Sequence, residues 1–383
     1  MKVLAEQMPV LANPSSLHSA GRRARLAVDR ARAEVAAAAG ADPSEVIFTS
    51  GGTEADNLAV KGLYWHRRGQ DSRRTVIVLP AIEHHAVLET AEWLEHRDGA
   101  ELVILPVDER GLVDAESLEQ VLSQRAEEIA LVTVMWANNE VGSVQPIQEL
   151  AQLCRSAGVP FHTDAVQAFG ALEVNFAASA ASTMAISGHK VGAPVGIGAL
   201  LVRRNIALTP VLHGGGQERD IRSGTLDAPA ICAFGAVAAE VAAQRGAEAR
   251  RIAELRDRLA RVVVESIPSA SIQGPDPLHD PELRLPNNLH ITVDGAEGDS
   301  LLFMLDMAGF DTATGSACTA GVPRPSHVLL AMGLSESQAR GAQRFSLGHT
   351  TTAEDIDALA EALPDIAERA CRAGLASQPS TTG

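Results

Sequence analysis

The stretch "AISGHKVGAPVGIGALLV", residues 185–202, places a lysine between a histidine and a run of glycines. Apolar runs on both sides of this turn, at 183–188 and 197–204, have the composition of buried strands. Lysine side chains usually lie on solvated surfaces, so Lys190 is unexpected in a tight turn between two core strands. Glycines allow the backbone to approach closely. We therefore interpret this turn as a place where Lys190 points inward toward a chemical partner.

Short apolar runs alternate with helical patterns along most of the chain. Helices are typified by "RRARLAVDRARAEVAAAAG" (22–40), which closes at Gly40, and by "IQELAQLCRSAG" (147–158). Strands are predicted for the apolar runs at 45–50, 75–81, 101–107, 129–137, 159–165, 183–188 and 197–204. This alternation predicts an α/β fold whose large domain has a mostly parallel seven-stranded sheet covered on both faces.

The pattern changes near residue 246. The segment "AEARRIAELRDRLARVVVES" is a charged amphipathic helix, and it is followed by a strand pattern at 287–293 and a helical pattern at 297–309. These features indicate a second, smaller α+β domain. We expect a large domain at 12–245, a small domain formed by 1–11 and 246–372, and a disordered tail at 373–383.

The composition indicates a globular enzyme of small molecules. Of 383 residues, 46% are hydrophobic and 21% charged, and the formal net charge is −16, which argues against a nucleic-acid or anionic-membrane surface. The four cysteines form no CxxC pair, so neither a zinc site nor a disulfide framework is indicated. The chain contains no leader pattern and no apolar run near the ~20 residues of a membrane span. The expected compartment is the cytoplasm.

Polar residues follow five of the predicted strands. In open α/β sheets, ligands bind outside the carboxyl ends of the strands. The residues at these ends are Gly51, Gly52 and Thr53 after 45–50; Glu83, His84 and His85 after 75–81; Asn138, Asn139 and Glu140 after 129–137; Asp164 and Gln167 around the end of 159–165; and His189 and Lys190 after 183–188. One such group is ordinary turn or cap chemistry, but five together indicate a site.

This set fits the needs of pyridoxal phosphate. A lysine must form a Schiff base with its aldehyde, and a carboxylate must keep the pyridine nitrogen protonated. A glycine-rich helix N-terminus must bind the phosphate, and a flat side chain should stack on the ring. Lys190, Asp164, the 51–53 turn and His84 can fill these four roles. A metal is not indicated, because no further ligand lies at useful spacing from His84 and His85.

Five motifs then give a specific resemblance. The segments "MWANNEVG", "FHTDAVQAFG", "SGHKVGAPVGIGAL", "HGGGQERDIRSGT" and "TGSACTAG" resemble those of cysteine desulfurases, which are pyridoxal-phosphate enzymes of the class V aminotransferase group. The resemblance covers about residues 12–360. It implies the fold of the PLP-dependent transferases of type I.

The resemblance also implies roles for individual residues. Lys190 would hold the cofactor as a Schiff base, and His84 would stack on the ring and assist proton transfer. Asp164 would pair with the ring nitrogen, and Arg344 would bind the substrate carboxylate. The remaining cofactor contacts would come from Gln167 and Asn139 on the hydroxyl side of the ring, from Gly52, Thr53, Ser187 and His189 at the phosphate, and from Thr225 at the phosphate of a second subunit in a homodimer.

The expected reaction depends on Cys318. Cys154, Cys232 and Cys371 lie in helical or alanine-rich patterns and are interpreted as small buried hydrophobic residues. Cys318 lies instead in "TATGSACTAGVPRP", a predicted mobile loop in which a thiolate could be exposed. The resemblance implies that Cys318 takes sulfur from L-cysteine as a persulfide and that alanine is released. The sulfur would then pass to an acceptor protein for iron–sulfur cluster assembly or for tRNA or cofactor thiolation.

The chain departs from the family at its beginning, where members usually carry an Asp-x-x-Ala-Thr-Thr-Pro type segment. We expect that a natural start lies upstream of "MKVLAEQMPVLANPSSLH"; the alternative is a protein that lacks this segment and has an impaired site. Two alternative functions stay open at this point: a selenocysteine lyase or other lyase on the same fold, and a catalytically weak scaffold for sulfur-transfer partners.

Overall fold

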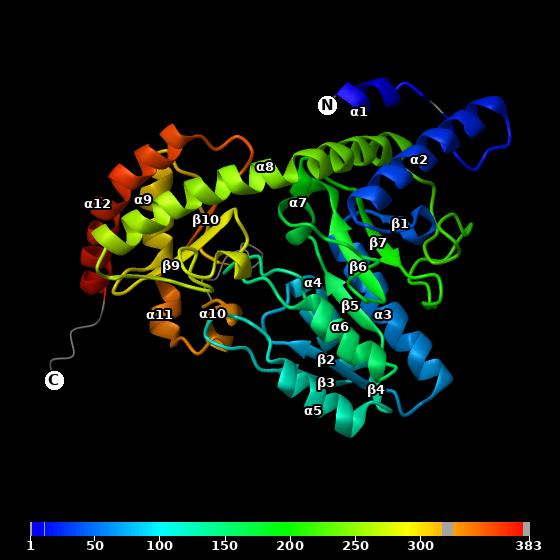
Figure 1. Ribbon diagram of the computed structural model, residues 1–383, viewed down its shortest axis with the longest axis horizontal. Helices are drawn as coiled ribbons and strands as arrows, with labels where there is room; N and C mark the ends of the chain where they lie inside the picture. The colour runs from blue at the N-terminus through cyan, green and yellow to red at the C-terminus, as the bar shows by residue number, and fades with distance from the viewer. Residues whose placement is uncertain (1, 11, 316–324, 378–383) are drawn as a thin grey trace. The chain divides into compact units, whose positions relative to one another are not determined.

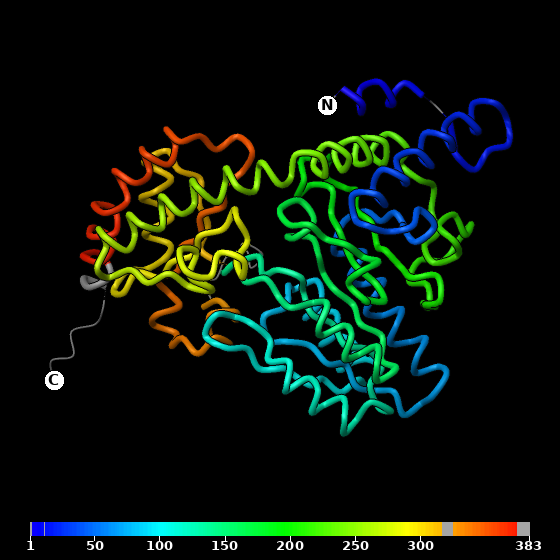
Figure 2. Tube along the Cα trace, viewed as in Figure 1, coloured from blue at the N-terminus to red at the C-terminus, as the bar shows by residue number. Residues whose placement is uncertain are grey.

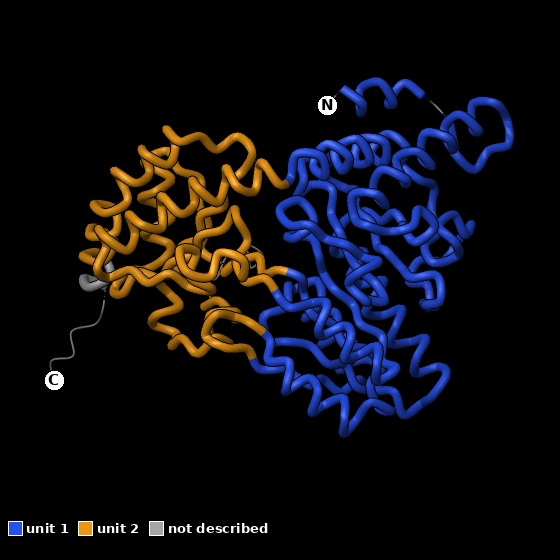
Figure 3. Tube along the Cα trace, in the orientation of Figure 1, with its two compact units in different colours: residues 1–106, 113–136, 145–245 blue, residues 107–112, 137–144, 246–383 orange. Residues whose placement is uncertain are grey.

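The computed structural model describes residues 2–10, 12–315 and 325–377, and the chain divides into two compact units (Figure 3). Unit 1 comprises residues 1–106, 113–136 and 145–245, and unit 2 comprises 107–112, 137–144 and 246–383. The last passage of the chain from unit 1 to unit 2 lies inside a single helix, α8 (Ala228–Ser266), which is continuous in the trace (Figure 2). Helix α1 (Lys2–Gln7), which we expected with the smaller domain, falls in unit 1 by this division.

The seven expected strands of unit 1 form one sheet with the order β1-β7-β6-β5-β4-β2-β3. Neighbours from β6 through β5, β4 and β2 to β3 pair in parallel, whereas β7 is antiparallel to both β6 and β1. The expectation of a mostly parallel seven-stranded sheet is therefore confirmed. The strands are β1 (Val46–Thr49), β2 (Val76–Pro80), β3 (Glu101–Leu105), β4 (Ile129–Thr133), β5 (Phe161–Asp164), β6 (Thr183–Ser187) and β7 (Gly198–Val202).

Helices cover the sheet because its inner strands are apolar on both faces. Every residue of β2, β4, β6 and β7 is buried, as expected for strands packed on both sides. Helix α3 packs across β4 to β7 and against α4, while α6 packs on β5 and against α5 (Figure 1). The helices of this unit are α1, α2 (Ser19–Ala38), α3 (Gly52–Gln70), α4 (His85–Asp98), α5 (Ala115–Arg125), α6 (Ile147–Ser156), α7 (Ala168–Ala171) and the first part of α8, with short 3-10 turns η1 (Pro43–Glu45) and η2 (Gly188–Val191).

Unit 2 contains an antiparallel sheet with the order β10-β9-β8. The apolar side chains of this sheet, including Leu289, Ile291 and Phe345, form a core with residues of α8, α9 and α12. The elements after α8 are β8 (Ala270–Ile272), η3 (Pro281–Leu283), β9 (Asn288–Val293), α9 (Gly298–Met307), α10 (His327–Ala331), α11 (Glu336–Arg340), β10 (Ala342–Ser346) and α12 (Ala353–Ser377). Residues 373–377, which we expected in the disordered tail, belong to α12.

Across the described ranges, none of the helices combines the length and the apolar character that crossing a bilayer requires.

Gly198 lets the start of β7 approach the turn that follows β1. A Cβ atom at this position would lie 2.8 Å from both Cα and the carbonyl carbon of Gly51 and 2.8 Å from the carbonyl oxygen of Ile186. These neighbours are backbone atoms, which cannot rotate away as a flexible side chain can. Gly51 is also the residue that precedes α3. A side chain at 198 would therefore disturb both the sheet and the helix start.

We predict that Gly198→Ala lowers the free energy of unfolding by about 1–3 kcal/mol, because the added methyl group forces backbone apart. Urea unfolding followed by circular dichroism measures this change. Gly69→Ala is the matched control, since Gly69 lies exposed in α3 with no atom within 4 Å of the added Cβ. It should stabilise the protein by up to about 1 kcal/mol. Equal stability of the two variants would contradict this account.

Candidate functional site

The sheet brings the polar strand ends of unit 1 to one edge. Strands β2, β4, β5 and β6 run in the same direction, and β1 shares it because both β1 and β6 are antiparallel to β7. The residues that follow these strands therefore lie along the same carboxyl edge, as the sequence predicts. The predicted site residues carried by this edge are Gly52, Thr53, His84, Asp164, Gln167, Ser187, His189 and Lys190.

The first turn of α3 forms a backbone cradle. Gly51 precedes the helix with φ 155° and offers no side-chain cap, so the first N–H groups of α3 point outward without a capping oxygen from it. A Cβ atom on Gly52 would lie 2.8 Å from Cγ2 of Val166 and 3.6 Å from Cβ of Ser187. The helix start, the segment after β5 and the end of β6 therefore meet here. Such a helix N-terminus attracts anions.

Asp164 and Lys190 form the electrostatic centre of this edge. The Asp164 side chain is 6% exposed, and its Oδ1 accepts a hydrogen bond of 2.8 Å from the Val166 N–H. Burial raises the pKa of Asp164 to about 6, while the Val166 N–H and the positive charge of Lys190 act in the opposite direction. Lys190 lies on η2 and is exposed. A pKa of about 6 means that the Asp164 carboxyl group can gain or lose its proton at mildly acidic pH.

Two histidines have defined hydrogen bonds at the edge. His84 caps α4, because its Nδ1 accepts a hydrogen bond of 3.1 Å from the Ala86 N–H. His189 contacts the buried Ser187 through Nδ1 and Oγ, which are 2.8 Å apart. Burial and the charge of Lys190 lower the pKa of His189. The His189 ring is therefore favoured in its neutral form.

Thr225 lies exposed in the segment 203–227, which contains no helix or strand and is described throughout. Two ion pairs attach this segment to the site. Arg32 of α2 contacts Glu218 through two hydrogen bonds of 2.6 and 2.8 Å, and Glu218 also accepts the Phe48 N–H. Arg222 pairs at 2.8 Å with Glu54, the residue after Thr53 in α3. The geometry around Thr225 is thus tied to the helix start.

Asn139 and Arg344 belong to unit 2. Arg344 lies on β10 opposite His290 of β9, and its Nη1 donates a hydrogen bond of 2.9 Å to the Asn139 carbonyl oxygen. The structure therefore brings these two predicted residues together. Cys318 lies outside the described residues.

The residues at the strand ends include Glu83, to which the sequence assigns no role. The same reasoning does not identify Asp56 or His162 as site residues. Glu83 is buried and accepts the Met135 N–H at 2.7 Å, and burial followed by the charge of Asp164 raises its pKa to about 8. Asp56 and His162 are buried and contact each other at 3.2 Å. The signal that could have found them is a charged residue in an apolar setting, since Asp56 follows Ala55 in α3 and His162 follows Phe161 in β5.

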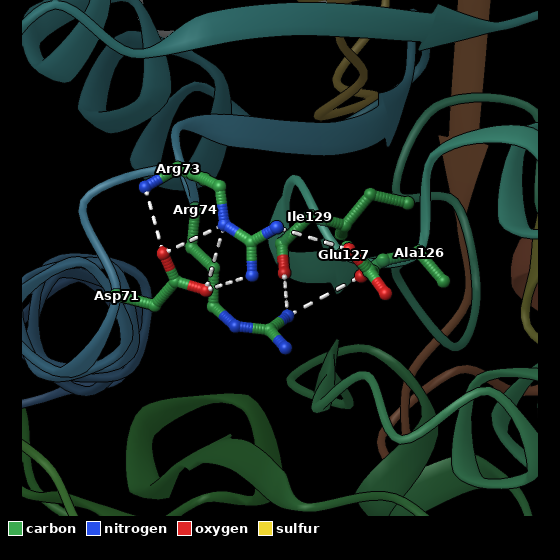
Figure 4. Close-up of polar contacts among 6 residues, drawn as sticks. All are labelled: Asp71, Arg73, Arg74, Ala126, Glu127 and Ile129. Carbon is green, nitrogen blue, oxygen red and sulfur yellow. Dashed lines mark hydrogen bonds and ion pairs between the residues drawn. The ribbon is translucent and has the colours of Figure 1, made fainter.

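The opposite edge of the sheet holds a surface hollow of about 590 Å³ before β2 and β4. Figure 4 shows polar contacts around two of its lining residues, Arg73 and Glu127: Arg73 pairs with Asp71 and Glu127, and the neighbouring Arg74 donates to the carbonyl oxygens of Ala126 and Ile129. Charges of both signs are paired there on exposed side chains. This arrangement is typical of a surface ion-pair network that closes the amino ends of the strands.

Comparison with known proteins agrees with this geometry. The family model described as aminotransferase class-V matches residues 2–359, which is most of the chain. This chain belongs to the aminotransferase class-V family. The expected fold of this family is likewise confirmed by the sheet described above and by the solved structures below.

Within this family, the chain is similar to proteins named as cysteine desulfurases. The chain is 49% identical over 378 residues to an "IscS-like cysteine desulfurase" of Mycobacterium tuberculosis, with 98% of this chain and 95% of the relative covered. It is 38% identical to a "Cysteine desulfurase IscS" of Methanosarcina thermophila, over 93% of this chain and 85% of the relative. The resemblance to cysteine desulfurases is thereby confirmed.

Two solved structures extend the similarity to three dimensions. A "NifS-like protein" is similar with a TM-score of 0.86 and 31% identity, covering 96% of both chains. A NifS-like protein from Rickettsia africae has a TM-score of 0.82 at 31% identity, covering 96% of this chain and 95% of its own.

The raised pKa of Glu83 predicts a pH-dependent stability. Between the ordinary value of 4.5 and about 8, the folded protein keeps a proton that the unfolded chain releases. The free energy of unfolding should therefore fall as pH rises through this window, and Glu83→Gln should make that fall smaller by the contribution of Glu83 while keeping an oxygen for the Met135 N–H. We expect the variant to gain roughly 1–3 kcal/mol over the natural chain between pH 5 and 8.

Urea unfolding of the cofactor-free protein at several pH values checks this prediction. Glu92→Gln, which changes an exposed carboxyl group on the same α4 helix, serves as the control and should keep the profile of the natural chain. A constant difference between Glu83→Gln and the natural chain at all pH values would show that Glu83 is ionised in the fold.

Proposed function

We propose that this chain is a cysteine desulfurase that uses pyridoxal phosphate to convert L-cysteine to L-alanine. The observation that carries the proposal is the buried Asp164 carboxyl group under the influence of Lys190, at the strand edge that also holds the α3 N-terminus. The identity of 49% to an IscS-like cysteine desulfurase supports it.

The donor set of unit 1 fits pyridoxal phosphate. Its phosphate needs N–H and hydroxyl donors, which the first turn of α3, Thr53, Ser187 and His189 can supply. Its protonated ring nitrogen needs a carboxylate partner, and the buried carboxyl group of Asp164 is suited to that role. Glycine is required at position 52, because a Cβ atom there would lie only 2.8 Å from Cγ2 of Val166. When bound, the cofactor supplies an aldehyde for amino groups and a ring that accepts electron density.

Lys190 is proposed to hold the cofactor covalently until substrate arrives. The exposed position of Lys190 on η2 suits a side chain that must be displaced by an amino acid and later return. Its Nζ can then move the proton of the substrate Cα. The pull of the Asp164 carboxylate on the ring nitrogen would keep that nitrogen protonated.

His84 is proposed to lie against the ring, with Gln167 and Asn139 on its hydroxyl side. Because Nδ1 of His84 accepts the Ala86 N–H, the neutral imidazole carries its proton on Nε2. Nε2 is therefore the atom through which His84 would give a proton during catalysis.

Arg344 is proposed to bind the substrate carboxylate. Its guanidinium group has a planar fork that can donate two parallel hydrogen bonds to a carboxylate. The hydrogen bond from Nη1 to the Asn139 carbonyl oxygen restrains the side chain before substrate binds. A restrained arginine loses less freedom on binding.

Cys318 is proposed to receive the sulfur. Its thiolate attacks the sulfur of cysteine, the sulfur–carbon bond breaks, and the electron pair of that bond remains on the carbon side, which takes up a proton as alanine. The products are L-alanine and a persulfide on Cys318, so sulfur and electrons balance without a further reactant. An acceptor protein or an added thiol then takes the outer sulfur.

We further propose a homodimer in which Thr225 reaches the phosphate site of the second subunit. The ion pairs of Arg32 with Glu218 and of Arg222 with Glu54 support this role, because they hold the segment that carries Thr225.

Cys318→Ser should stop sulfur transfer and leave the cofactor in place. With L-cysteine and dithiothreitol, the natural chain should form alanine and sulfide in equal amounts. The variant should lose most of this activity, because a hydroxyl group cannot form a persulfide, while its cofactor absorbance is retained. Cys371→Ser, which changes a partly exposed thiol on α12, is the control and should keep full activity. Alanine formation by Cys318→Ser at the natural rate would contradict the proposal.

Arg344→Lys should raise the KM for L-cysteine by about ten- to a hundredfold, because one of two hydrogen bonds to the carboxylate is lost. Steady-state kinetics measures KM and kcat separately. Arg340→Lys, on the exposed side of α11, should leave both constants unchanged. An unchanged KM in Arg344→Lys would remove Arg344 from substrate binding.

A further inference from the structure

A row of polar side chains crosses the sheet beneath the carboxyl edge of unit 1. His162 of β5 lies opposite Thr133 of β4 and opposite Thr183 of β6 in the strand register. Residues paired in this way project from the same face of a sheet. All three side chains are 0% exposed. The Thr133 hydroxyl has no hydrogen-bond partner among the described residues, whereas both ring nitrogens of His162 have one.

His162 finds its partners on two different elements. Its Nε2 lies 3.2 Å from Oδ1 of Asp56, and its Nδ1 lies 2.9 Å from Oγ1 of Thr183. Asp56 belongs to α3 and lies one helical turn after Gly52. The hydrogen bond therefore connects the helix whose first turn forms the anion cradle to the strand that ends in Asp164.

Asp164 projects from the same face as His162, because the two residues are separated by one position in β5. The pair is therefore placed directly behind the carboxyl group proposed to hold the ring nitrogen. Any shift of α3 against β5 would move the phosphate cradle relative to Asp164. The Asp56–His162 contact resists that shift.

The charges at this edge determine the form of the pair. Three buried carboxyl groups, Asp56, Glu83 and Asp164, act on one another, and Lys190 is the cation that acts on Asp164. Burial, then Asp164 and Glu83, raises the pKa of Asp56 well above its ordinary value. Burial also lowers the pKa of His162 to about 3. The raised pKa of Asp56 and the lowered pKa of His162 both favour the uncharged form of this hydrogen-bonded pair.

We propose that Asp56 and His162 are positioning residues, a buried hydrogen-bonded pair that fixes the α3 phosphate cradle relative to the Asp164 carboxylate. The proposal rests on the proposed function, because it concerns the same cofactor site. Since the pair is uncharged, it adds no second negative charge behind the ring. Asp164 then acts as the carboxylate that faces the ring nitrogen.

Two substitutions at Asp56 separate hydrogen bonding from charge. Asp56→Asn keeps a neutral donor for Nε2 of His162, whereas Asp56→Leu keeps a similar volume and removes the donor. Thr163→Val is the matched control, because Thr163 lies on the opposite face of β5, buried, with no hydrogen-bond partner for its hydroxyl among the described residues. Each protein is titrated with pyridoxal phosphate, and the absorbance of the bound cofactor is followed against pH. Thermal unfolding of the cofactor-free proteins reports their folding.

Asp56→Leu should raise the Kd for pyridoxal phosphate by about ten- to a hundredfold, since one buried hydrogen bond is lost and Nε2 is left unpaired. Asp56→Asn should stay within about threefold of the natural Kd, and its absorbance midpoint should move by less than about 0.3 pH units. Thr163→Val should behave as the natural chain does. A purely structural role for Asp56 would change the thermal unfolding of the cofactor-free protein and leave the Kd for pyridoxal phosphate unchanged.

The proposal is overturned if Asp56→Asn moves the midpoint by about one pH unit or more, because Asp56 would then carry a charge. It is also overturned if Asp56→Leu binds the cofactor as tightly as the natural chain. Should Asp56→Leu fail to fold, the asparagine variant alone decides, through its midpoint and its Kd. A natural chain that binds no pyridoxal phosphate would contradict the proposed function as well, whereas normal binding with insensitive variants contradicts only the pair.

Discussion

The burial of the Asp164 carboxyl group, beside the Val166 N–H and under the positive charge of Lys190, is the constraint around which this site is organised. A buried carboxylate is costly unless a positive group compensates it, and two further buried carboxyl groups, Asp56 and Glu83, raise that cost. Burial raises the pKa of Asp164 to about 6 and raises the pKa values of Asp56 and Glu83 as well, while the charge of Lys190 lowers that of Asp164. The carboxyl edge of the sheet thus carries a buried carboxyl group, Asp164, that can become negatively charged near pH 6.

Close backbone approach makes this electrostatic arrangement possible. Gly198 lets β7 lie against Gly51, and Gly52 lets α3 begin against Val166 and Ser187. The helix N-terminus, the end of β5 and the end of β6 are therefore held within van der Waals contact. Ion pairs from Glu54 and Glu218 then attach the segment 203–227 to the same region. The charges at the carboxyl edge determine which chemistry the site can perform, and the glycines allow the groups of the site to lie close together.

Much of the fold follows from local sequence patterns. All seven strands of unit 1 form within or close to the apolar runs, and glycine-rich turns follow β1 and β6 as expected. The strand order does not follow from local patterns, because the placement of β7 between β1 and β6 is decided by tertiary packing. Asp56 and His162 were missed for a related reason: each looks like an isolated polar residue in an apolar segment, and only the packing of α3 on β5 brings them together. Roles for Arg344 and Thr225 came from the family resemblance alone.

The sharpest test of this account is borohydride reduction of the purified holoprotein, followed by mass spectrometry of its peptides. The sequence has three lysines, Lys2, Lys61 and Lys190, so the attachment point can be assigned without ambiguity. Lys61 lies over the ring of Trp93, with Nζ 4.6 Å from the ring centroid, and serves as an internal comparison. We predict a stable pyridoxyl phosphate group on Lys190. Reduction that leaves Lys190 unlabelled, or labels Lys61 in its place, would contradict it.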